Sequence, residues 1–160
     1  MEKICGLPPI IDANSKILIL GSFPSPLSLK YQRYYGNPQN HFWPILAHLL
    51  QEKFPASYDE KTKMALKHGV ALWDVIKTCY RQGAADADIE EPEVNELESF
   101  VREHNELRAV FFDGRTAERI FKMHYEEFPF FTEYLPSTSS AHAKPWKDKL
   151  EEWKKILRYL

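Results

Sequence analysis

The hydrophobic residues of the chain fall into four short runs that predict β-strands. These runs lie at residues 16–21, 70–73, 109–112 and 130–135, and polar or turn-forming residues separate each of them from the segment that follows. Short, continuous apolar runs are typical of strands that are buried on both faces. The pattern therefore predicts a sheet at the centre of the molecule.

The segments between these runs repeat their apolar residues at helical spacing. In residues 42–54, the side chains of Phe42, Ile45 and Leu49 share one face of a helix, and residues 144–160 follow the same pattern. Three further helices are predicted at residues 58–68, 92–104 and 115–125, the first ending before Gly69 and the second beginning at Pro92.

Strands that alternate with helices favour a mostly parallel sheet covered on both faces. We therefore predict an α/β fold, a three-layer α/β/α sandwich with a central sheet of about four strands. A chain of 160 residues can bury a sizeable core, so residues 1–160 are expected to form a single domain. Residues 82–93, rich in Ala, Asp and Glu, are expected to form the longest irregular connection.

Charge and cysteine content narrow the classes of function. A net charge of −2 argues against a surface coated with basic residues for non-specific nucleic-acid binding, but it allows local basic patches. One such patch contains Lys30, Arg33 and His41. A second contains His142, Lys144, Lys147 and Lys149. Cys5 and Cys79 have no spacing that suggests a disulfide framework or a zinc site. Without a signal sequence or a membrane-spanning run, the protein is expected to be cytoplasmic.

The first predicted strand leads directly into a loop whose composition suggests chemistry. It ends in Gly21-Ser22-Phe23-Pro24-Ser25, and an aromatic, amide-rich segment follows at residues 34–43. Open α/β sheets bind their ligands beyond the carboxyl ends of the strands, so a site is expected at this end. Within the segment, Asn40 precedes a predicted helix, and its spacing alone would also fit a helix cap.

Three segments carry a resemblance to a known family. They are residues 21–25, residues 37–43 (Asn-Pro-Gln-Asn-His-Phe-Trp) and residues 135–142 (Leu-Pro-Ser-Thr-Ser-Ser-Ala-His). Together they resemble the signature loops of the uracil-DNA glycosylase superfamily, and more narrowly those of its hypoxanthine-DNA (deoxyinosine) glycosylase branch. The similarity spans nearly the whole chain. It implies an enzyme that rotates a deaminated base out of DNA and cleaves its glycosidic bond.

The resemblance implies roles for the residues of the first loop. Asn40 is the expected catalytic residue, because its amide can accept from a water and donate elsewhere without acting as a strong base. Phe42 is expected to stack on the extruded base, although burial in the core would explain it equally well. Gly21 and Ser22 can bring backbone N–H groups close to the base. Phe23 stands where other branches carry Asp or Asn, which moves the positioning of water to Asn40.

Asp74 ends the second predicted strand, where pyrimidine-specific relatives carry an Asn that reads the base. A carboxylate only accepts hydrogen bonds, so it can receive the N1–H of hypoxanthine. It can equally receive the N3–H of uracil, so uracil is not excluded. A helix cap or a salt bridge would also explain an Asp at this position.

The serine-rich segment at residues 135–142 is expected to form the other half of the site. Hydroxyl and backbone N–H groups hold phosphates without reading the sequence, although such a segment is also typical of a plain turn. The residues predicted to contact DNA are Ser25, Ser137, Thr138, Ser139, Ser140, His142 and Lys144. The chain departs from the family pattern at Leu135, in place of a catalytic His of some relatives, and at Asp113, Ser140 and His142, in place of Asn, Pro and Asn.

These expectations describe a monomeric, monofunctional DNA glycosylase that releases hypoxanthine and leaves the abasic site uncut. No metal or cofactor is expected, since neither metal-ligand spacing nor a phosphate-binding loop occurs in the sequence. Two alternatives stay open: a substrate of uracil or of a broader set that includes xanthine, and a non-catalytic protein that binds damaged DNA. A nucleotide-binding α/β protein of another kind is disfavoured by the missing glycine-rich loop.

Overall fold

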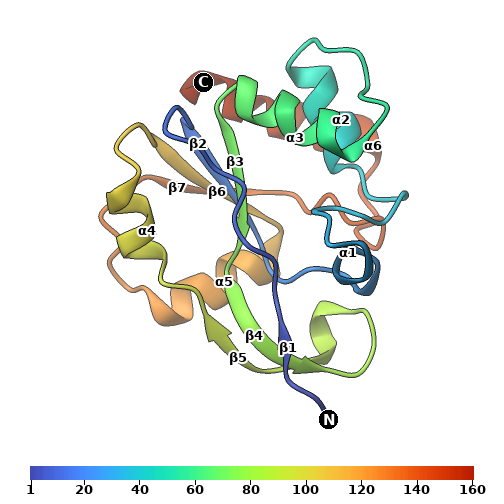
Figure 1. The fold of residues 1–160 in the computed structure, drawn as a ribbon, viewed down its shortest axis with the longest axis vertical. Coiled ribbons are helices and arrows are strands. Elements are labelled where there is room, and N and C mark those ends of the chain that lie inside the picture. The colour runs from blue at the N-terminus through green and yellow to red at the C-terminus, as the bar shows by residue number, and fades with distance from the viewer.

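The predicted central sheet is present and parallel. The computed structural model describes residues 1–160 (Figure 1). Its main sheet contains β2 (Ile17–Gly21), β3 (Val70–Asp74), β6 (Ala109–Asp113) and β7 (Thr132–Leu135), in the order β3-β2-β6-β7. All neighbouring strands in it run parallel, so their carboxyl ends meet at one edge of the sheet.

Strand β2 is buried along its whole length because both faces of the sheet are covered. Successive side chains of a strand point to opposite faces. Ile17 and Ile19 accordingly belong to one hydrophobic cluster, and Leu18 and Leu20 to the other. All four side chains are fully buried.

Helices cover each face of this sheet and complete the predicted three-layer α/β/α sandwich (Figure 1). One face carries α2 (Phe42–Leu49), α3 (Tyr58–Lys67) and α6 (Trp146–Trp153), with a 3₁₀ turn at Lys154–Tyr159 after α6. The other face carries α4 (Leu97–Glu103) and α5 (Arg115–His124). None of the helices has the length and apolar composition that crossing a lipid bilayer requires.

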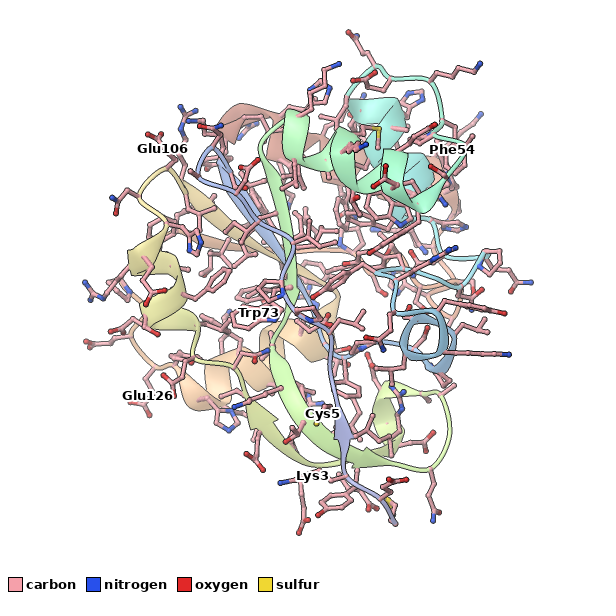
Figure 2. All side chains as sticks on the ribbon, in the orientation of Figure 1. Lys3, Cys5, Phe54, Trp73, Glu106 and Glu126 are labelled. Atoms are coloured by element: carbon pink, nitrogen blue, oxygen red, sulfur yellow. The ribbon has the colours of Figure 1, made fainter.

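A second, smaller sheet and a short helix were not predicted. The helix is α1 (Pro26–Tyr31). The sheet is antiparallel in the order β1-β4-β5, and its strands are β1 (Ile4–Cys5), β4 (Ile76–Arg81) and β5 (Ile89–Val94). It lies beyond the end of β3, near the N-terminus, where Lys3 pairs with Glu93 (Figures 1 and 2).

Two sequence predictions in this region are wrong. Residues 82–93 are not irregular throughout, because they contain a 3₁₀ turn at Asp86–Asp88 and most of β5. The helix predicted at 92–104 starts only at Leu97. Pro92 was the misleading signal, since proline favours a first helical turn but is also tolerated on an edge strand such as β5.

The two sheets share one hydrophobic cluster, which contains Leu20 of β2 and Ile76 of β4 and against which Trp73 packs. Trp73 lies on β3 near the middle of the molecule (Figure 2), and its ring packs on Phe100 of α4 with the ring centroids 4.3 Å apart. Directly after β3, the backbone N–H groups of Val75 and Ile76 donate to the carbonyl oxygens of Gly21 and Ser22. The chain thus passes into β4 while still bonded to the loop that follows β2.

Candidate active site

A polar cavity of about 140 Å³ opens where the parallel strands end. Gly21 ends β2, Asp74 ends β3 and Asp113 ends β6, and all three line the cavity. The loops after β2 and β7 supply most of the remaining wall. The structure thus brings together these predicted residues: Gly21, Ser22, Phe23, Ser25, Asn40, Asp74, Ser137, Thr138, Ser139 and Ser140.

Gly21 is required by the close approach of two strand ends. A Cβ atom at this position would lie 2.6 Å from Oδ1 of Asp74, closer than real contacts allow. Tyr35 also closes on this point, with its hydroxyl 3.7 Å from the same position. Any larger residue would therefore displace Asp74, and the absence of a side chain lets the backbone reach the cavity.

The residues after Gly21 are fixed by hydrogen bonds of the loop. The hydroxyl of Ser22 donates to Oδ1 of Asp86 over 2.9 Å, and Ser25 caps α1 by accepting from the N–H of Ser28. Phe23 is only 7% exposed, and the Arg81 guanidinium lies 5.3 Å from the centre of its ring. The loop is therefore held through the hydroxyl groups of Ser22 and Ser25 and through the ring of Phe23.

Asn40 lines the cavity and also binds the first turn of a helix, from the position before its N-cap residue His41. Its Oδ1 accepts a hydrogen bond of 2.8 Å from the N–H of Phe42, in the first turn of α2. The side-chain nitrogen has no partner in the protein, and a carbonyl oxygen retains a second lone pair. The two interpretations of Asn40 are therefore compatible, because the bond that caps the helix leaves the amide group able to bind a further molecule.

Tyr35 occupies the place in the cavity that was predicted for Phe42. Phe42 is fully buried and does not line the cavity. The Tyr35 ring stacks on it, with the centroids 4.0 Å apart and the planes at 14°, and Tyr35 itself forms part of the cavity wall. The Tyr35 backbone has a φ of 54°, an uncommon conformation for a residue other than glycine. Phe42 thus supports the ring that faces the cavity.

Asp74 is a buried carboxyl group without a complete set of partners. It is 6% exposed, and its Oδ2 is sealed from solvent with no hydrogen-bond partner. Burial raises the pKa of this carboxyl group to about 7, and the charges of Asp113 and Asp86 add to the effect. Neither a helix cap nor a salt bridge explains Asp74, which lines the cavity with unused capacity to accept hydrogen bonds.

Asp113 is a second buried carboxyl group in the same cavity. Its Oδ1 accepts from the N–H of Thr138 over 2.8 Å, and its Oδ2 accepts from the Thr138 hydroxyl over 2.7 Å. Burial raises the pKa of Asp113 to about 6, while Thr138, Tyr35 and Lys149 act against this rise. Burial and the nearby carboxyl groups hold the pKa of the Tyr35 hydroxyl well above its ordinary value, so Tyr35 is a neutral donor.

The serine-rich segment lies at the cavity only in part. Ser137, Ser139 and Ser140 line the cavity, but both donors of Thr138 are used by Asp113. Thr138 also lines the cavity, but it is 1% exposed and holds the loop in place through these bonds; its contact with DNA stays a prediction. His142 and Lys144 lie outside the cavity wall, with Lys144 paired to Glu152.

The cavity wall also contains residues that the sequence analysis did not predict for the site, among them Tyr35, Arg81, Asp86 and Asp113. A signal existed for Asp113, because it ends a predicted strand as Asp74 does. Arg81 gave none, since the strand that carries it was not predicted. Its guanidinium is 7% exposed, donates from Nη1 to the carbonyl of Pro24 over 2.9 Å, and leaves Nε buried without a partner.

Comparison with known proteins gives consistent results. The family model of the uracil DNA glycosylase superfamily matches residues 8–160. A hypoxanthine DNA glycosylase of Methanosarcina acetivorans is 38% identical over 96% of this chain and 98% of its own, and one of Methanosarcina barkeri is 33% identical over 92% and 94%. The solution structure of a candidate uracil DNA glycosylase from Methanosarcina acetivorans superimposes with a TM-score of 0.85, at 34% identity and 98% coverage of both chains.

The raised pKa of Asp74 predicts how stability depends on pH. The folded protein keeps the Asp74 proton up to about pH 7, whereas the unfolded chain releases it near pH 4, so the free energy of unfolding falls as the pH rises through this window. The asparagine side chain of the Asp74→Asn variant cannot ionise, so the variant does not lose stability in this way as the pH rises. In urea titrations, the free energy of unfolding of the variant relative to that of the wild type should increase by on the order of 2–4 kcal/mol from about pH 4.5 to about pH 8. A difference that stays constant with pH would contradict the assignment.

Proposed function

The chain belongs to the uracil DNA glycosylase superfamily, whose members repair deaminated bases in DNA, and we propose that its own substrate is hypoxanthine. One observation supports this proposal most directly: an amide, an aromatic face and an unpartnered carboxyl group (Asn40, Tyr35 and Asp74) line one cavity. A base inside a duplex cannot reach such a cavity, so the nucleotide has to rotate out of the helix.

Tyr35 and Asp74 would bind the base. The Tyr35 ring offers a flat face, already fixed from behind by Phe42, and stacking of a base on an aromatic ring contributes about 1–3 kcal/mol. Once ionised, above its pKa of about 7, the carboxylate of Asp74 would accept the N1–H of hypoxanthine. Adenine has no hydrogen on N1, so its N1 acceptor would face the carboxylate acceptor of Asp74 without a hydrogen bond. The pair therefore distinguishes the deaminated purine from its parent base.

Asn40 would position the water. The bond between C1′ of the sugar and N9 of the base breaks, and its electron pair leaves with the base. A water molecule adds to C1′, transfers a proton to solvent or to the leaving base, and yields an abasic site. The second lone pair of Asn40 Oδ1 can accept a hydrogen bond from this water and fix its direction of approach. No lysine is needed, so the abasic strand stays uncut.

The serine-rich loop would hold the DNA backbone. The hydroxyl and N–H groups of Ser137, Ser139 and Ser140 border the cavity and are of the kind that contact phosphates. They line the same cavity as the residues from Gly21 to Ser25. We expect a single copy of the chain to bind one lesion.

A non-catalytic protein that binds damaged DNA is the second candidate. The observation in its favour is the absence of other acid–base groups at two family positions: Phe23 is an apolar ring, and Leu135 is fully buried outside the cavity. Catalysis would then depend on Asn40 without help from those positions.

The substrate proposal can be tested with labelled duplexes that carry one hypoxanthine, uracil or xanthine, followed by alkaline cleavage of abasic sites. We expect hypoxanthine to be released fastest under single-turnover conditions, because Asp74 and the Tyr35 face fit a purine with N1–H. Preferential release of uracil would reject the substrate. Binding of all three duplexes without any release would favour the non-catalytic candidate.

Asn40 can be tested separately from its capping role. Asn40→Ala should lower the rate of hypoxanthine release by about 10²–10³-fold, the usual cost of losing one positioned polar group, and should also lose about 1 kcal/mol of stability from the helix cap. Asn40→Ser keeps a capping oxygen and should lose activity with little loss of stability. Asn105→Ala, at an exposed turn, is the matched control. Equal rates for Asn40→Ser and wild type would refute the assignment.

Stacking on Tyr35 predicts a loss of affinity for the lesion. Tyr35→Ala should weaken binding of hypoxanthine-containing DNA by roughly 5- to 150-fold, which corresponds to about 1–3 kcal/mol of lost stacking. Tyr35→Phe keeps the ring and should retain most of the affinity. Fluorescence anisotropy under conditions that prevent turnover measures both. Unchanged affinity in Tyr35→Ala would show that the base does not stack on this ring.

A further inference from the structure

Lys149 is a buried lysine that lies outside the cavity wall and contacts both loops of the site. It belongs to α6 and has no exposed surface. Its Nζ donates to the carbonyl oxygen of Ser139 over 3.0 Å and lies 3.4 Å from Nδ1 of His41. Ser139 belongs to the serine-rich loop, and His41 stands between Asn40 and the first residue of α2.

The two loops are also joined directly to each other and to Asp113. The N–H of His41 donates to the carbonyl of Thr138 over 2.9 Å. Thr138 in turn donates from its N–H and its hydroxyl to the two oxygens of Asp113. A continuous set of contacts therefore runs from the Lys149 ammonium to the Asp113 carboxyl group in the cavity.

A buried ammonium group is costly unless an opposite charge compensates it. Lys149 forms no ion pair, so no carboxylate contacts it closely. Burial lowers its pKa, and Asp113 is the one carboxyl group that opposes this change. On the other side, the cavity wall contains Asp74, Asp86 and Asp113 but only one cation, Arg81. The positive charge of Lys149, which lies outside the cavity wall, thus compensates the negative charge of these carboxyl groups.

We propose that Lys149 is a positioning residue of the site: its ammonium group joins the Ser139 carbonyl to the His41 ring and balances the buried Asp113 carboxylate, so that both loops keep the spacing needed for catalysis. The proposal rests on the glycosylase function proposed above. It adds a residue on α6 to a site that is otherwise built from strand ends and loops.

The charge of Lys149 should favour the ionised form of Asp113, in addition to the hydrogen bonds of Thr138 and Tyr35. Four groups act on this carboxyl group: Thr138 and Tyr35 by hydrogen bonding, Lys149 by its charge, and Asp74 as a second carboxyl group of the cavity. Burial, and after it the charge of Lys149, lowers the pKa of His41, which therefore accepts from the ammonium as a neutral ring. Protonation of Asp113 would weaken one of its bonds to Thr138 and loosen the serine-rich loop, so activity should fall on the acid side.

The test compares Lys149→Met with Lys149→Arg in single-turnover release of hypoxanthine from pH 5 to pH 9. Without the cation, the pKa of Asp113 rises above its value of about 6. Asp74, with a pKa of about 7, shapes the acid limb of every variant, so the effect is read relative to the wild type. The acid limb of the Lys149→Met profile should lie higher than that of the wild type by about half to one pH unit, with a larger loss of rate at pH 6 than at pH 8. Lys149→Arg should restore the wild-type profile.

Lys155 provides a matched control. It also donates to a backbone carbonyl, that of Tyr134, but it does not line the cavity or contact either loop of the site. Lys155→Met should therefore keep the wild-type pH profile. An unchanged profile in Lys149→Met, or a loss of rate that is equal at every pH, would overturn the proposal.

A second measurement needs neither DNA nor activity. The carboxyl ¹³C signal of Asp113 can be titrated by NMR in the wild type and in Lys149→Gln, which is also the substitute if Lys149→Met does not fold. A higher midpoint in Lys149→Gln supports the proposal, and an identical midpoint overturns it. Because this titration does not depend on substrate, it separates a failure of the Lys149 proposal from a failure of the proposed glycosylase function.

Discussion

The site depends on the burial of carboxyl groups at the edge of a parallel sheet. Strands β2, β3 and β6 end side by side, so Asp74 and Asp113 are placed in one small cavity, where burial raises both pKa values. Such groups are costly in a protein interior, and their cost is offset only by specific partners. Asp113 has Thr138 and Tyr35, whereas one oxygen of Asp74 has none. This unequal distribution of partners leaves the carboxyl group of Asp74 as the less satisfied of the two.

The aromatic wall and the amide are both held by the first turn of α2. Phe42 lies beneath Tyr35, and the N–H of Phe42 binds Asn40. The rotation and depth of this helix thus set the positions of the stacking ring and the amide together. Trp43 and Trp153 pack edge-on against Phe42, with centroids 4.9 and 5.8 Å away, and thereby connect the helix to the hydrophobic core. The geometry of the cavity is therefore a property of the core as well as of the loops.

The sequence was sufficient for the main sheet, its helical layers and most of the cavity wall, because these follow from apolar periodicity and from residues at strand ends. It failed where two signals compete. Pro92 favours both a helix start and an edge strand, and the chain uses the second. Phe42 and Tyr35 belong to the same aromatic segment of the sequence, and only the folded geometry decides which of the two rings faces the cavity. Thr138 resembles its serine neighbours in sequence, yet the partner that occupies its donors lies at the end of β6.

The bond between Arg81 and Pro24 joins the small antiparallel sheet to the loop after β2, across 57 positions of the sequence. Since β4 carries Arg81 and β5 only completes the outer edge, the two strands differ in how much variation they can tolerate. Substitutions along β5 alter a surface, but a shift of β4 moves a guanidinium that supports the cavity. The small sheet thus supports the cavity wall, and natural variants should diverge faster on its outer strand β5 than on its central strand β4.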